Sequence, residues 1–190
     1  MPGNEQTAGV KANRRIPLAA LATAMALLGP VSCAGRSTPA AAATTVTFGG
    51  TDLAWIEITI AMDEQVQPLL DLVPSHSRDP KVQALGVQVQ AVAKAELATL
   101  RSLHDQAGLP AANPHEGMPM PGVVTIDKVN QAARLSGTTF DAVAVEQIRG
   151  YLEHGIDLAQ SEQKSGAEAQ TRALALNVIR TRTEALSSIK

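Results

Sequence analysis

Aromatic residues and cysteine are scarce in this chain. Its 190 residues include one tryptophan, one tyrosine, two phenylalanines and one cysteine. A single cysteine excludes a disulfide within the chain. The formal net charge of −2, together with so few aromatic side chains, argues against nucleic-acid binding. No stretch alternates apolar and polar residues for long enough to predict a strand, whereas the abundance of Ala, Leu and Gln favours helices.

The patterns of common catalytic sites are also missing. The only thiol lies near the N-terminus, and the chain has neither a glycine-rich phosphate loop nor a nucleophile elbow. None of the four histidines has a glutamate three residues before it, so the Glu-x-x-His pattern of di-iron bundles is absent. We therefore expect that the protein is not an enzyme.

Residues 1–33 are predicted to be an export signal. Arg14 and Arg15 precede an apolar run over 16–29, and small residues follow it. The run is shorter than the roughly 20 residues that span a bilayer, and its flanks fit a signal better than the alternative, a buried core helix. The two arginines leave both general secretion and the twin-arginine route open.

Cys33 is the predicted lipidation site. It directly follows Ser32, the small residue expected before a lipidated cysteine, although Pro30 stands where leucine is usual. A lipid would explain a lone thiol in an exported protein and would attach the chain to a membrane. The location is then the outer face of the cell membrane or the periplasm. The alternative is a freely secreted protein cut near the alanine run 40–43.

The rest of the chain is predicted to be a tether over 34–47 and one all-α domain over 48–190. The tether is rich in Ala, Thr and Ser and cannot form a core. In the domain, apolar residues recur at spacings of three and four in four long segments. These lie at about 51–73, 80–107, 138–165 and 167–188, with a loop over 109–124 and a short helix over 126–135.

Several residues mark the predicted helix ends. Asp79 and Pro80 are a typical helix start, and Thr138 with Asp141 is spaced as a capping box. Four long helices bury their apolar stripes best as a four-helix bundle. The order of helix pair, linker and helix pair suggests a duplication of 51–107 in 138–189. An apolar stripe left uncovered would allow self-association into a homo-oligomer.

Short motifs in the linker and in the second helix pair resemble a known family, the domain of unknown function numbered 305. They are Met120-Pro121-Gly122, Thr125-Ile126-Asp127, Ser136-Gly137 and Phe140-Asp141. The resemblance implies a ferritin-like four-helix bundle of two similar helix pairs, often exported and in some members linked to copper.

The His-His pair that a typical member of this family carries in each half is missing here. Met62-Asp63 and Tyr151-Leu152 stand at the two places. The resemblance therefore implies the fold, whereas it does not carry the family's metal ligands onto this chain.

One cluster of soft ligands remains in the loop. His115, Met118 and Met120 offer one imidazole and two thioethers, which Cu(I) prefers. The alternative is that these methionines pack over the bundle. Met62 and His154 are secondary candidates, although Met62 also fits the apolar stripe of its helix and His154 also fits an exposed histidine beside carboxylates.

The sequence thus predicts an exported, lipid-anchored helical bundle that binds a partner or acts at the cell envelope without catalysis. The alternative is an extracytoplasmic copper-binding protein. Copper is the one cofactor considered, the membrane is a partner through the lipid on Cys33, and the sequence identifies no protein partner.

Replacing Cys33 with alanine tests the anchor. We expect the Cys33→Ala protein to be exported but to leave the membrane fraction, because the lipid-bearing thiol is gone. Ser32→Ala is the control, since alanine is an equally small residue before the cysteine and membrane association should persist. Fractionation of cells followed by immunoblotting measures both. Membrane association of Cys33→Ala equal to that of the wild type would rule out the anchor.

Overall fold

The computed structural model describes residues 47–189, and within this range all regular structure is helical. The predicted signal with Cys33 and nearly all of the predicted tether lie outside the described residues. The helices are α1 (Gly50–His76), α2 (Pro80–Ala107), α3 (Ile126–Ala132), α4 (Gly137–Ser165) and α5 (Ala169–Ser187). The prediction of an all-α fold with four long helices and one short connecting helix is confirmed.

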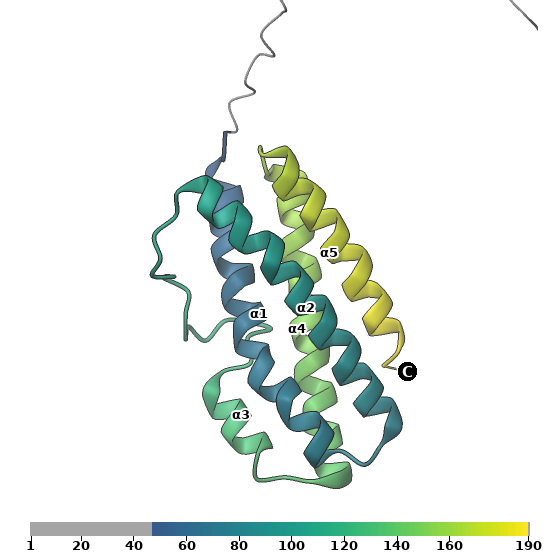
Figure 1. The fold of residues 1–190 in the computed structure, drawn as a ribbon. Coiled ribbons are helices and arrows are strands. Elements are labelled where there is room, and N and C mark those ends of the chain that lie inside the picture. The colour runs from purple at the N-terminus through teal and green to yellow at the C-terminus, as the bar shows by residue number, and fades with distance from the viewer. Residues whose placement is uncertain (1–46, 190) are drawn as a thin grey trace, which may run out of the picture. The chain divides into compact units, whose positions relative to one another are not determined.

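The four long helices pack side by side as a bundle (Figure 1). α1 contacts α2 and α4, and α5 contacts α4 and α2, so the order around the bundle is α1, α2, α5, α4. The connection from α2 runs back along α1 to α3 before α4 begins. A long crossover between two helical hairpins is one of the connections that four-helix bundles use.

The start and end of α2 follow from its sequence. Asp79 Oδ1 accepts a hydrogen bond from the backbone N–H of Lys81 at 2.8 Å, and Pro80 occupies the first helical position. Gly108 then ends the helix in the left-handed conformation, with φ of 66°. The predicted start at Asp79 and Pro80 and the predicted end near 107 are confirmed.

α1 continues beyond 73, the predicted end of this segment, and includes Pro74. Proline within a helix removes one donor, yet the backbone N–H of Ser77 still bonds to the carbonyl of Val73 at 3.0 Å. Tertiary contacts hold this last turn in place. His76 Nδ1 lies 2.6 Å from the carbonyl oxygen of Leu135, and its ring centroid lies 5.2 Å from that of Phe140.

The predicted capping box at the start of α4 is wrong. Ser136 is the N-cap and makes no side-chain capping bond. The helix begins at Gly137, whose φ is 58°, so Thr138 already lies inside the first turn and cannot cap it. α3 is also shorter than expected, because the chain leaves the helix after Ala132 through single turns that bond Arg134 to Gln131 and Leu135 to Ala132.

The buried apolar residues form two clusters, one toward each end of the bundle. The cluster near the α1–α2 turn is centred on Val66, Leu69, Phe140 and Ile148. The cluster near the α4–α5 turn is built around Ile56, Leu100 and Val178.

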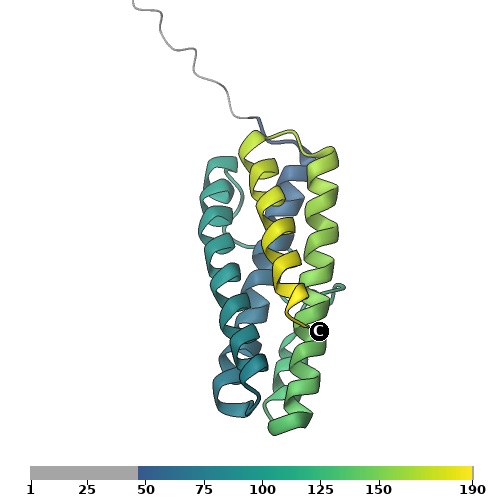
Figure 2. The ribbon, with the colours of Figure 1, turned by 90° about the vertical axis from the view of Figure 1, so that its right-hand side faces the viewer.

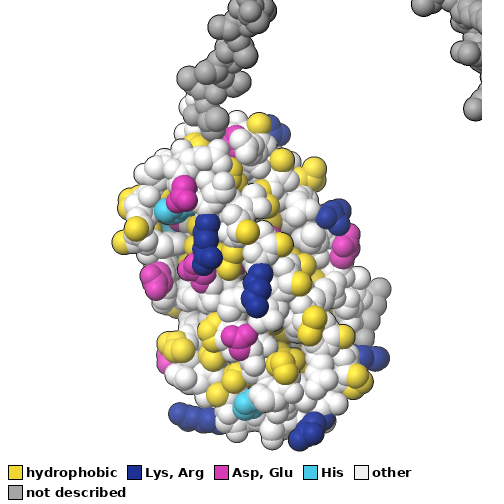
Figure 3. Space-filling model, viewed as in Figure 1, with side chains coloured by type: hydrophobic (Ala, Val, Ile, Leu, Met, Phe, Trp, Pro, Cys, Tyr) yellow, Lys and Arg dark blue, Asp and Glu magenta, His cyan; other side chains and the backbone are white. Residues whose placement is uncertain are grey.

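The described surface carries both charge signs. On the face in Figure 3, acidic and basic side chains are interspersed rather than gathered by sign. Among the described helices, none combines the length and the apolar composition needed to cross a bilayer.

Candidate functional site

Polar side chains from all four long helices meet at the boundary between the two apolar clusters. They are Asp63 of α1, Glu96 of α2, Tyr151 of α4 and Arg182 of α5, and none is more than 2% exposed. We call these four residues the polar layer. It is the largest group of buried titratable side chains that contact one another in the described part of the chain.

Arg182 is the centre of the polar layer. Its Nη2 donates to Asp63 Oδ1 at 2.6 Å and to Glu96 Oε2 at 2.5 Å, and its Nε also donates to Glu96 Oε2 at 3.1 Å. Tyr151 donates its hydroxyl proton to Asp63 Oδ1 at 2.6 Å. The guanidinium carbon lies 4.4 Å from the centroid of the Tyr151 ring, which adds a cation–π contact.

One cation in this layer faces two carboxyl groups. Burial alone would lower the pKa of Arg182, but Tyr151, Asp63 and Glu96 act against it and hold that pKa above its ordinary value. Burial raises the pKa of Asp63 to about 7, against the lowering effect of Arg182. Burial also raises the pKa of Tyr151 well above its ordinary value. Arg182 therefore stays charged, and Asp63 holds a proton for part of the time near neutral pH.

Gly155 of α4 makes room for this arrangement. A Cβ atom at position 155 would overlap Nη1 of Arg182, so only a residue without a side chain lets the guanidinium lie against α4. Nη1 of Arg182 and Oδ2 of Asp63 are both buried without a protein hydrogen-bond partner. The other polar side-chain atoms of the layer are hydrogen-bonded, among themselves or, for Glu96 Oε1, to the hydroxyl of Thr181 at 3.3 Å.

The two places at which the family resemblance would put histidine pairs do converge in space. Asp63 and Tyr151 belong to these places, and they are hydrogen-bonded to each other. Arg182 was not among the residues predicted to face inward on its helix, yet it is fully buried. The spacing of Leu174, Val178, Arg182 and Ala185 places all four on one helical face and was the available signal.

A second candidate site lies on the side of the bundle where α1 faces α4, beneath the loop that precedes α3. It is a pocket of about 310 Å³. Its lining residues are Ile58, Met62, Met120, Pro121, His154, Asp157 and Leu158.

Gly122 brings the loop against both helices at this pocket. Its φ is 76°, and a Cβ atom there would lie 2.6 Å from His154 Cβ and 3.0 Å from Met62 Cε. His154 Nδ1 lies 3.9 Å from Asp157 Oδ2. The structure therefore gathers one imidazole and two thioethers, from Met62, Met120 and His154, around one pocket.

The three loop residues predicted as copper ligands are divided. Met120 lines the pocket, whereas neither His115 nor Met118 does. Met118 is 44% exposed, and the backbone N–H of His115 bonds to Asn113 Oδ1 at 2.9 Å. Asn113 in turn donates to the backbone carbonyl of Glu57 at 2.8 Å. This bond fixes the part of the loop around His115 nearer to the N-terminus of α1 than Met62, which lines the pocket.

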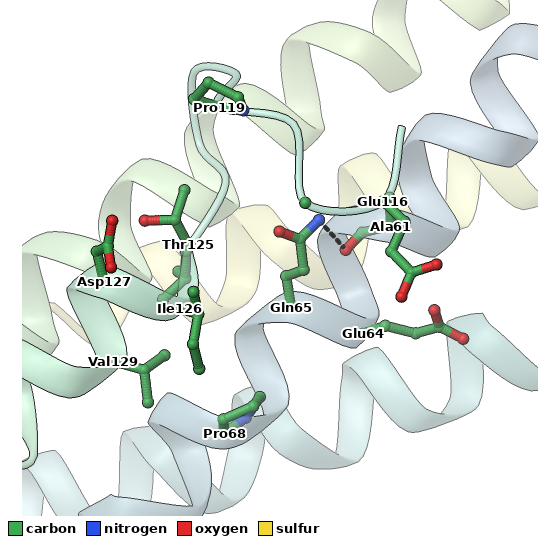
Figure 4. A pocket seen from close by; sticks show the side chains of 12 residues that line it. Ala61, Glu64, Gln65, Pro68, Glu116, Pro119, Thr125, Ile126, Asp127 and Val129 are labelled. Atoms are coloured by element: carbon green, nitrogen blue, oxygen red, sulfur yellow. Dashed lines mark hydrogen bonds between the residues drawn. The ribbon is translucent and has the colours of Figure 1, made fainter. Parts of the chain in front are cut away.

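Another pocket, of about 530 Å³, lies between α1, the loop and the start of α3 (Figure 4). Three carboxylates border it, from Glu64, Glu116 and Asp127. Glu64 accepts a hydrogen bond from Arg101 at 2.8 Å. Across the described residues, no group of three or more His, Cys, Asp or Glu side chains is arranged to hold a metal ion.

Comparisons with known proteins support the fold. The sequence model of a family described as a domain of unknown function, DUF305, matches residues 52–190. A crystal structure of a DUF305 protein from Streptomyces coelicolor, whose description proposes that it is secreted, aligns with a TM-score of 0.65 at 14% identity. That alignment covers 73% of this chain and 89% of the other.

A second crystal structure, of a DUF305 fragment from Deinococcus radiodurans, aligns with a TM-score of 0.66 at 11% identity. It covers 75% of this chain and 94% of the fragment. No functionally curated protein matches the chain.

Replacing Arg182 with methionine tests the polar layer. We expect a loss of about 3–5 kcal/mol in the free energy of unfolding, because two buried carboxyl groups lose their cation. Arg180→Met is the matched control. Arg180 is 61% exposed and pairs with Glu184 on the surface, so its loss should cost less than about 1 kcal/mol. Urea denaturation followed by circular dichroism measures both.

Removing the whole layer separates charge pairing from packing. In the variant with Asp63→Leu, Glu96→Met, Tyr151→Phe and Arg182→Met, no buried charge is left unpaired, and most of the stability lost in Arg182→Met should return. An Arg182→Met protein as stable as the wild type would contradict the central role of the guanidinium.

Proposed function

The chain belongs to the DUF305 family, a domain of unknown function, and from its own residues we propose that it is an exported, lipid-anchored binding protein that acts at the cell envelope without catalysing a reaction. Export is supported by the leader over 1–33 and by the description of the Streptomyces coelicolor relative. The anchor rests on Cys33, the only thiol in the chain.

The polar layer is the observation that carries the non-catalytic part of the proposal. Ferritin-like bundles place their metal chemistry in the interior, between facing helices. In this chain the same region holds Arg182, a permanent cation that already pairs with Asp63 and Glu96. A metal ion there would face the charge of the guanidinium, so binding is expected at the surface pockets instead.

A turnover assay tests this proposal. The purified full-length protein is incubated with Fe(II) or Cu(I) in air, and oxidation of the metal is followed against buffer. We expect no acceleration, because the interior offers no open coordination position. Oxidation that is faster with the protein, and that depends on its concentration, would overturn the proposal.

A second candidate function is the binding of Cu(I) at the pocket lined by Met62, Met120 and His154. Thioether sulfur and imidazole nitrogen are the donors that Cu(I) favours, and the three side chains come from α1, the loop and α4. Met62 is 1% exposed, whereas the side chain of His154 is 45% exposed, so the three donors reach from the interior to the surface. These residues fit Cu(I) better than a hard cation, because Asp157 is the one carboxylate among the lining residues.

Two methionines in the same loop give a matched test of this candidate. We expect Met120→Leu to weaken Cu(I) affinity at least about tenfold, because even the loss of a residue that only orients a metal ligand typically costs about that much. Met118→Leu should leave the affinity unchanged, because Met118 does not line the pocket. Competition with a chromophoric Cu(I) chelator measures both. Equal affinities for the two variants would reject the pocket as the copper site.

A further inference from the structure

A single carboxylate connects the start of α1 to the turn between α4 and α5. Asp52 accepts hydrogen bonds from the backbone N–H groups of Gly49 at 2.6 Å, Ala167 at 3.1 Å and Glu168 at 3.1 Å. Figure 2 shows the α4–α5 turn beside the start of α1, at one end of the bundle. Asp52 is fully buried, so these bonds close that end of the bundle.

Glu162, in the last turn of α4, is a second buried carboxyl group at the same end. It is 0% exposed, and neither of its oxygen atoms receives a hydrogen bond from a protein donor. No basic side chain in the described range forms an ion pair with it. A buried carboxylate without a donor or a cation is strongly unfavourable. A proton on Glu162, donated to Asp52, would satisfy it, and a hydrogen bond between these two side chains contributes to the pKa of each.

We propose that Asp52 and Glu162 share one proton, and that this proton acts as a structural ligand that holds the start of α1 against the end of α4. In this state Glu162 is a neutral acid that donates to Asp52, and Asp52 is the carboxylate that also accepts the three backbone N–H groups. The proposal goes beyond the proposed function and does not depend on it.

The titration of the two groups is consistent with this geometry. Burial, the hydrogen bond to Asp52 and the charge of Asp52 raise the pKa of Glu162 to about 8. Burial would also raise the pKa of Asp52, but the hydrogen bonds from Glu162 and from the backbone outweigh it and leave that pKa below its ordinary value. Two carboxyl groups that share one proton are expected to separate in this way.

The other charged groups near the pair do not replace the proton. Glu168 is already occupied, because its Oε2 accepts from the backbone N–H and the hydroxyl of Thr171 at 2.5 and 2.8 Å. Arg172 of α5 is exposed, and its charge lowers the pKa of Glu162 by less than burial and Asp52 raise it. Lys164, on the same helix as Glu162, is exposed as well.

The shared proton makes the stability of this end of the bundle dependent on pH. The ordinary pKa of Glu162 is 4.5, whereas in the folded protein it is about 8. Between these values the folded state binds one proton more than the unfolded state, so stability falls as the pH rises through this range and levels off above it. Asp63 also lowers the stability as the pH rises between 3.8 and about 7. A matched variant is therefore needed to isolate the contribution of Glu162.

Glu162→Gln tests the proposal, because an amide donates to Asp52 in the same place but does not titrate. Urea denaturation of the full-length protein in detergent is measured between pH 4.5 and 8. We expect the folded-to-unfolded ratio of the wild type to fall, relative to that of Glu162→Gln, by about tenfold for each pH unit. Glu146→Gln, the same change at an exposed position of α4, should follow the wild type.

Parallel pH profiles for the wild type and Glu162→Gln would overturn the proposal. If the variant does not fold, the wild type decides the question through the carbon-13 NMR titration of the Glu162 carboxyl group. A midpoint near 8 supports the shared proton, and a midpoint near 4.5 rejects it. Trp55, the only tryptophan in the chain, lines a pocket with Glu162, so its fluorescence is a local probe of the same transition.

Discussion

The buried charge of Arg182 is the constraint on which the interior of this bundle depends. Removing a guanidinium from water is costly, and the cost is offset only when fixed partners surround it. Each of the other three long helices supplies one: Asp63 from α1, Glu96 from α2 and Tyr151 from α4. The absence of a side chain at Gly155 and the division of the apolar core into two clusters follow from the same requirement.

The bundle satisfies its buried carboxyl groups in two different ways. In the polar layer the permanent cation of Arg182 pairs with two carboxyl groups, those of Asp63 and Glu96. One cation does not balance two negative charges, and Asp63 is the group whose pKa is raised. At the end near the α4–α5 turn no described basic side chain forms an ion pair with Glu162, and backbone N–H groups together with a proton take the place of a cation. The first solution ties four helices together, and the second ties a helix start to a turn 115 residues away.

The sequence predicted the elements well and the sites less well. The four long helices follow from apolar spacing, and the start of α2 follows from Asp79 and Pro80, because both signals are local. Arg182 was missed although its spacing put it inside, since the partners that make its burial tolerable lie on three other helices. Met120 was separated from Met118, and joined to Met62 and His154, only by the path of the loop at Gly122. Such contacts depend on tertiary structure, which short motifs do not encode.

The polar layer also fixes the axial register of the four long helices relative to one another. Apolar side chains on neighbouring helices are largely interchangeable, so a purely apolar bundle tolerates a slip of one helical turn, about 5.4 Å, at modest cost. Here such a slip of α5 would carry Arg182 away from Asp63 and Glu96 and place its charge among aliphatic side chains. A single row of polar residues therefore specifies the vertical alignment of all four helices, much as a polar residue at one core position sets the register of a coiled coil.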